Sequence, residues 1–114
     1  MDALYIRETN NFCVRETTLF HNDIRRLVGG TPIEYISSCG KYGLWANKEL
    51  RGDPNDSASK IAKQFELGIP FVIGPAVIIG RKENLHGVQL GRSLTKEEID
   101  EFTSVCTIHQ YEIA

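Results

Sequence analysis

The segment from residue 51 to residue 60 carries the side chains best suited to hold an anion. It is a polar loop containing Gly52 that leads into an expected helix, and the free backbone amides at a helix N-terminus attract negative charge. The side chains available for phosphate oxygens are Arg51, Ser57, Ser59 and Lys60, with Asn55 among them. The segment lacks the spaced glycines of a phosphate loop. It therefore indicates either a ligand site or an ordinary capped helix start after a loop.

Two aromatic residues precede this loop on an expected strand. Tyr42 and Trp45 can stack on a base or another flat ligand if their face of the sheet is open. Packing of Trp45 beneath a helix is the alternative, and the sequence leaves both open. We include both aromatic residues in the candidate ligand site.

No catalytic residue is expected from the histidines. Each of the three lacks a nucleophile or an acid partner at local spacing, which general base catalysis requires. The strongest of them is His86, which lies in a glycine-containing loop; the others are His21 and His109. A surface loop position is the preferred explanation of His86, so an enzyme is not the favoured interpretation.

No metal site or cofactor is expected either. Carboxylates gathered in one polar loop can hold a hard cation, but the spacing of Glu49, Asp53 and Asp56 fits no known calcium loop, and helix capping and solvation explain them. The three cysteines lie far apart, without a CxxC pair, so neither a disulfide framework nor a zinc site is supported. They are expected to be reduced thiols in the cytoplasm: Cys13, Cys39 and Cys106.

Length and composition indicate one globular domain spanning residues 1–114. The chain is 41% apolar and 25% charged, as in ordinary globular proteins. Its net charge of -2 argues against binding to duplex nucleic acid, which needs many cations in one field. The N-terminus has no leader pattern, and no stretch approaches the length of a membrane span. We expect no membrane partner.

A few basic residues stand close together within this nearly neutral chain. They are the pairs Arg25-Arg26 and Arg81-Lys82, with Arg92 further on. The fold can bring them together as a local anion patch, or it can leave them as solvated surface charge.

The first half of the chain predicts two hairpins around one helix. Residues 3–7 and 12–17 alternate apolar and polar side chains, and Asn10-Asn11 between them suits a turn. Thr18 can cap a helix that Gly29 and Gly30 end. Residues 33–47 then predict a second hairpin in which Leu44 and Ala46 share one face and Trp45 takes the other.

The second half predicts two helices and the centre of the sheet. A helix begins at an Asp56 or Ser57 N-cap and closes at Gly68. Residues 76–79 suit a central strand that is buried on both faces, and residues 88–90 suit a further strand. The sequence Thr95 to Glu98 is a capping box that opens a last helix bearing Ile99, Phe102 and Val105. The predicted class is α+β, with five or six mostly antiparallel strands and three helices.

The order of these elements resembles a family of small domains of unknown function found mainly in bacteriophages, prophages and plasmids. The resemblance extends from about Leu19 to Phe102. It is carried by the motifs Leu27-Val28-Gly29-Gly30 with Ile33-Glu34, Trp45-Ala46-Asn47, Asn55 with Ala58, residues 73–80, and Ser93-Leu94-Thr95 with Glu98-Ile99. The family brings no catalytic residues with it. The resemblance implies a mobile-element setting, in which small proteins often bind a host factor or a host signal.

These observations lead to one expected function and one alternative. We expect a non-enzymatic phage or mobile-element accessory protein, located in the host cytoplasm, that binds a small anionic, nucleotide-like ligand and sequesters a host defence signal. The alternative is a protein-interaction module that inhibits a host protein through a sheet edge or an exposed apolar patch. A homodimer is expected because small proteins often associate through two-fold interfaces.

Overall fold

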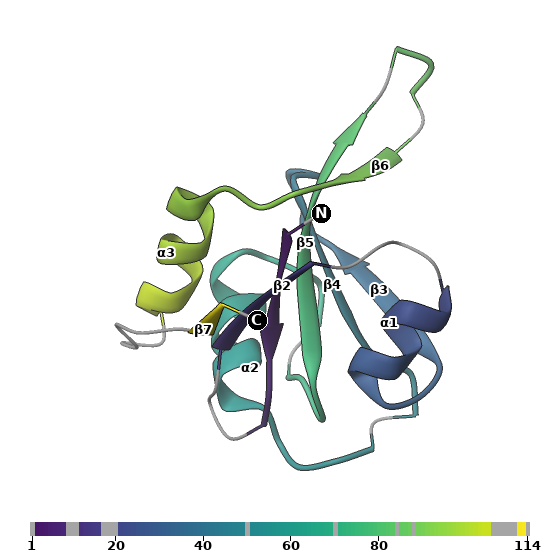
Figure 1. Ribbon diagram of the computed structural model, residues 1–114, viewed down its shortest axis with the longest axis vertical. Helices are drawn as coiled ribbons and strands as arrows, with labels where there is room; N and C mark the ends of the chain where they lie inside the picture. The colour runs from purple at the N-terminus through teal and green to yellow at the C-terminus, as the bar shows by residue number, and fades with distance from the viewer. Residues whose placement is uncertain are drawn as a thin grey trace.

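A computed structural model describes residues 2–8, 12–16, 21–49, 51–69, 71–83, 85–87, 89–105 and 112–113. Three helices and one mostly antiparallel sheet are seen in these residues (Figure 1), which confirms the α+β class. The elements follow in the order β1 (Asp2–Ile6), β2 (Phe12–Glu16), α1 (His21–Val28), β3 (Pro32–Ile36), β4 (Tyr42–Asn47), α2 (Asp56–Gln64), β5 (Ala76–Glu83), β6 (Gln89–Arg92), α3 (Lys96–Val105) and β7 (Glu112–Ile113).

The sheet is built around β5. Its strand order is β3-β4-β5-β1-β2-β7, and β6 pairs with the far end of β5. Both expected hairpins, β1 with β2 and β3 with β4, are present and antiparallel. The two-residue strand β7 pairs parallel to β2, a contact that the sequence pattern did not indicate. The β5–β6 hairpin projects beyond the body of the sheet, at the top of Figure 1.

The helices cover both faces of the sheet, α1 on one face and α2 with α3 on the other (Figure 1). Alternate residues of β5 therefore enter two separate cores: Ile78 packs on the α2 and α3 face, whereas Val77 and Ile79 pack beneath α1. All three side chains are 0% exposed, which confirms the prediction of a central strand buried on both faces.

Most local signals in the sequence have the predicted effect. Gly29 ends α1 with a φ of 78°, and the carbonyl of Arg25 accepts the N–H groups of both Gly29 and Gly30. The capping box of α3 is reciprocal: the N–H of Thr95 donates to Glu98 Oε1 at 2.9 Å, and the N–H of Glu98 donates to Thr95 Oγ1 at 3.2 Å. The predicted turn at Asn10-Asn11 and the Thr18 cap lie outside the described residues.

The prediction for the ends of α2 was wrong. The N-cap is Asn55 rather than Asp56 or Ser57, because its side-chain oxygen accepts the N–H of Ala58 at 3.1 Å. The helix ends at Gln64, before Gly68. Glu66 takes a positive φ of 53°, and the N–H of the fully buried Leu67 turns back to the carbonyl of Ala62. Burial of Leu67 therefore accompanies the early helix end.

Candidate functional site

Asn55, a candidate ligand residue, has its side chain inside the protein. It is 0% exposed, and its amide nitrogen donates to the carbonyls of Ile6 and Gly74 at 3.1 and 2.9 Å. Its amide oxygen is the N-cap of α2. The residue thus joins α2 to β1 and to the segment before β5, so its polar groups serve the fold.

The other candidates on α2 also divide by burial. Ser57 is buried, and Ser59 Oγ donates to the carbonyl of Asn55 at 2.8 Å while accepting the N–H of Val72 at 2.7 Å. Lys60 is exposed. The polar side chains at the start of α2 are therefore used in hydrogen bonds within the fold. Among the candidate residues there, only Lys60 is exposed to solvent.

The two aromatic candidates lie on opposite faces of β4. Tyr42 packs edge-on against Phe65 and Phe102, with ring centroids 5.8 and 4.9 Å away. Trp45 packs on the other core, beneath α1. Since neighbouring residues of a strand alternate between faces, the two rings cannot stack on one ligand.

Arg51 is the candidate that the structure places at an open hollow. This hollow, of about 600 Å³, lies between the C-terminal end of α1, the start of β3 and the segment after β4. We call it the basic hollow and define it by its lining residues: Asn22, Arg25, Arg26, Gly29, Gly30, Thr31, Glu49 and Arg51.

The side chain of Asn47 connects the two walls of the basic hollow. A Cβ on Gly30 would lie 2.6 Å from Asn47 Nδ2, so only glycine lets the α1–β3 turn approach the end of β4 this closely. Asn47 is 1% exposed, and its Oδ1 accepts the N–H of Glu49 at 2.9 Å. The buried Asn47 side chain thus packs against Gly30 in one wall and accepts a hydrogen bond from the backbone of Glu49 in the other.

A second glycine positions the segment that carries Arg51. Gly74 has a φ of 81°, and a Cβ there would lie 2.5 Å from the carbonyl oxygen of Arg51. Its N–H donates to the carbonyl of Asp53 at 2.8 Å. The Arg51 segment therefore packs directly on the backbone that enters β5.

The lining of the basic hollow holds three guanidinium groups and one carboxylate. Arg26 Nη2 lies 3.1 Å from Asp23 Oδ1, and Arg51 Nε lies 3.4 Å from Glu49 Oε2. The Arg26 and Arg51 side chains are 80% and 78% exposed, so these ion pairs are weak and readily exchanged. Arg25 is also exposed and forms no ion pair with another described residue. The hollow can therefore accept a negatively charged group.

The cations of this hollow are separated in the sequence, and no local pattern connects Arg51 with Arg25 and Arg26. Arg25 and Arg26 were grouped with Arg81 and Arg92, whereas the structure places Arg51 with the first pair. The signal available was the double glycine, which predicted that the chain turns sharply after Arg26. No sequence pattern marks Asn22 or Thr31 as a ligand residue, and Glu49 is considered from the sequence only as a metal ligand.

Arg81 belongs to an internal ion pair rather than to an anion patch. Its Nη1 lies 2.6 Å from Glu34 Oε2, and the two side chains are only 10% and 14% exposed. The pair crosses above Gly43, where a Cβ would collide with the carboxylate. Burial raises the pKa of Glu34 above its ordinary value, with the nearby Arg81 acting in the opposite direction.

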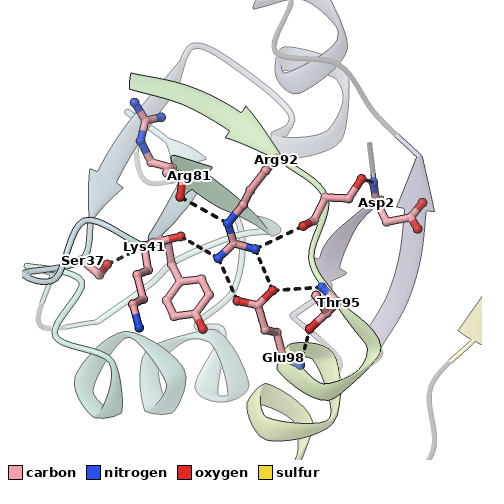
Figure 2. A network of polar contacts seen from close by, with 9 residues as sticks. Asp2, Ser37, Lys41, Arg81, Arg92, Thr95 and Glu98 are labelled. Carbon is pink, nitrogen blue, oxygen red and sulfur yellow. Dashed lines mark hydrogen bonds and ion pairs between the residues drawn. The ribbon is translucent and has the colours of Figure 1, made fainter. Parts of the chain in front are cut away.

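Arg92 forms a second internal network on the opposite face of the sheet (Figure 2). Its Nη1 and Nη2 donate to both carboxylate oxygens of Glu98 at 2.7 and 2.8 Å. Its Nε donates to the carbonyl of Arg81 at 3.3 Å and its Nη2 to that of Lys41 at 3.4 Å. The guanidinium also lies 5.7 Å from the ring centroid of Tyr42. This network fastens the base of the β5–β6 hairpin to α3 and to the β3–β4 turn.

The same network predicts how stability depends on pH. Hydrogen bonds from Arg92 lower the pKa of Glu98 from 4.5 to about 2. An unfolded chain therefore binds a proton at Glu98 before the folded chain does, and the stability contribution present above pH 4.5 is lost as the pH falls toward 2. We expect the unfolding free energy to decrease across this range, and urea titrations at several pH values measure it. Glu98→Gln should flatten this part of the profile; an unchanged slope contradicts the assignment.

Tyr42 gives the complementary effect at high pH. Burial, and next the hydrogen bond to Glu98, raise its pKa from 10 to about 12. The neutral phenol is thus favoured in the folded protein, and its contribution is present below pH 10 and is lost as the pH rises through 12. Both shifts describe a network that stabilises the fold, and neither group faces the basic hollow.

No helix among the described residues has the length and apolar character needed to cross a membrane. No group of three or more His, Cys, Asp and Glu side chains in that part of the chain is arranged to hold a metal ion. Comparison of the chain with protein-family models, curated proteins and solved structures gives no significant match.

Proposed function

We propose that this protein binds a small anionic, nucleotide-like ligand in the basic hollow. The observation that carries the proposal is that Arg25 and Arg26 from α1 and Arg51 from the segment after β4 line one open hollow. Guanidinium groups pair with phosphate oxygens in a planar, two-point geometry. The volume of about 600 Å³ lies within the range of small-molecule sites.

Binding without turnover is the activity that the lining residues support. They provide three cations, hydrogen-bonding groups at Asn22 and Thr31, and one carboxylate; His, Ser and Cys do not occur among the described residues that line the hollow. Glu49 is already paired with Arg51. We therefore propose capture of the ligand rather than its chemical conversion.

The proposed setting is the host cytoplasm, where a phage or mobile-element protein of this kind would sequester a host defence signal. The sequence motifs that resemble the mobile-element family include residues that build the basic hollow. Gly29 and Gly30 line it, and Asn47 joins its walls. The resemblance thus supports the mobile-element setting, and the site geometry supports the binding of an anion. The proposal includes a homodimer, for which the two-fold association common among small proteins is the only argument.

The test is a thermal-shift screen against mono-, di- and cyclic nucleotides, followed by calorimetry with those that bind. A ligand at about 100 times its Kd stabilises the folded state by about 2.7 kcal/mol. Arg25→Ala and Arg51→Ala are each expected to weaken binding by about 10- to 100-fold, since a hydrogen bond to a charged group contributes about 1.5 to 3 kcal/mol.

Lys60→Ala is the matched control, because it removes an exposed cation from α2, where the sequence alone placed the site. We expect this variant to bind as the wild type does. If Lys60→Ala lost binding and Arg51→Ala kept it, the ligand site would lie at the start of α2 instead of in the basic hollow. Absence of any shift across the screen would overturn the proposal.

A protein-interaction module remains the second candidate, on one specific observation. Leu85, at the tip of the projecting β5–β6 hairpin, is 101% exposed (Figure 1). An apolar side chain held away from the body of the protein can serve as an anchor for a partner protein. A host protein retained at stoichiometric amounts by the wild type but not by Leu85→Ser would favour this function.

A further inference from the structure

We infer that the Glu49 carboxylate is an internal competitor for the anion that the basic hollow binds. In the free protein Glu49 pairs with Arg51, and an incoming anionic group has to displace it. The inference rests on the proposed function and adds a residue that limits the affinity of that site. Its consequence is that removing the charge of Glu49 strengthens binding, although Glu49 lines the hollow.

The first observation is the contact itself. Glu49 Oε2 lies 3.4 Å from Arg51 Nε, and both residues line the basic hollow. The Glu49 side chain is 47% exposed and that of Arg51 is 78% exposed. A pair this exposed holds its partners weakly and exchanges with ions from solvent. Because the pair is exposed, an incoming anion can displace the Glu49 carboxylate from Arg51. Because the carboxylate is itself negatively charged, it occupies the position that the ligand would take.

The second observation is that the backbone of Glu49 is fixed. Its N–H donates to Oδ1 of the buried Asn47, and the N–H of Lys48 donates to the carbonyl of Thr31 at 2.8 Å. The turn that carries Glu49 is thus hydrogen-bonded both to the end of β4 and to the residue before β3. After displacement from Arg51, the carboxylate stays beside the hollow and repels the bound anion.

A different role for Glu49 would give the opposite result. A carboxylate in a nucleotide site can accept hydrogen bonds from ligand hydroxyl groups, and its removal would then weaken binding. The ion pair with Arg51 favours competition, because this carboxylate already has a cationic partner in the same lining. The sign of the change in affinity separates the two roles.

The experiment is calorimetric titration of the wild type and Glu49→Gln with inorganic pyrophosphate and with ADP. We expect Glu49→Gln to bind about three- to tenfold more tightly, the size expected for relief of repulsion between exposed charges a few ångströms apart. Glu97→Gln is the matched control, since it removes the same charge from the exposed first turn of α3 on the other face of the sheet. Its affinity should stay within about twofold of the wild type.

Placing Glu49→Gln in an Arg51→Ala background completes the design, because the gain should become smaller when Arg51, the guanidinium for which Glu49 and the ligand compete, is absent. Binding by Glu49→Gln but not by the wild type also supports competition. Wild-type binding that Glu49→Gln leaves unchanged or weakens overturns this inference and leaves the proposed function standing. Absence of binding by both proteins overturns the two together.

Discussion

Arg92→Ala is expected to lower the free energy of unfolding by about 2 to 3 kcal/mol. The Arg92 and Glu98 side chains are 26% and 15% exposed, so the substitution leaves a largely buried carboxylate without its cation. It also removes the hydrogen bonds to the carbonyls of Arg81 and Lys41 (Figure 2). For a chain of this size the change corresponds to roughly 10 °C in Tm. Urea and thermal unfolding followed by circular dichroism measure both quantities.

Arg26→Ala is the control for Arg92→Ala, because it breaks an arginine–carboxylate pair in which the arginine is 80% exposed. We expect a change of less than about 1 kcal/mol there. Gly80→Ala tests the same network from the strand side, since its Cβ would lie 2.6 Å from Arg92 Cγ and would push the arginine away from the sheet. Equal stability of the Arg92→Ala and Arg26→Ala variants would show that the network does not hold the hairpin base.

Asn55→Ala is expected to destabilise the protein by about 3 kcal/mol. The substitution removes an N-cap, which contributes about 1 kcal/mol, and leaves the carbonyls of Ile6 and Gly74 without a buried donor, at about 1 to 3 kcal/mol. Denaturant unfolding measures the loss. Asn55→Asp should also be unstable: the cap oxygen remains, but both donated hydrogen bonds are lost and a carboxylate oxygen replaces the donor beside the carbonyls of Ile6 and Gly74.

Asp56→Ala is the matched control for the Asn55 variants. Asp56 is one of the two N-cap residues predicted from the sequence, and it is exposed in the first turn of α2. Its removal costs only a favourable interaction with the helix dipole, below about 1 kcal/mol. If Asp56→Ala were the more destabilising change, the cap assignment would be wrong. Unchanged stability of Asn55→Ala combined with lost ligand binding would instead restore Asn55 as a ligand residue.

The two internal arginine pairs show how this small sheet buries charge on both faces. Arg81 lies above Gly43 on the α1 face and Arg92 lies above Gly80 on the opposite face. At Gly43 the absent side chain leaves room for the Glu34 carboxylate and the stem of Arg81, and at Gly80 it leaves room for the Arg92 side chain. Arg81 and Arg92 are paired with Glu34 and Glu98 inside the fold. The arginines available to a ligand are therefore those of the basic hollow.

The sequence by itself determined the local architecture. The hairpins, the glycine that ends α1, the capping box of α3 and the doubly buried β5 depend on residues a few positions apart. Backbone geometry and side-chain alternation act at that range. The expectation that Tyr42 and Trp45 share one open face was wrong, because alternation along β4 places them on opposite faces and in different cores.

Only the tertiary structure decided the N-cap of α2 and the membership of the candidate site. Asn55 is preferred over Asp56 because its amide reaches carbonyls of Ile6 and Gly74, which are far away in the sequence. Arg51 joins Arg25 and Arg26 because close packing at Gly30 and Gly74 brings their segments together. Such contacts depend on which strands become neighbours, and strand order is set by the burial of the whole core rather than by any local pattern.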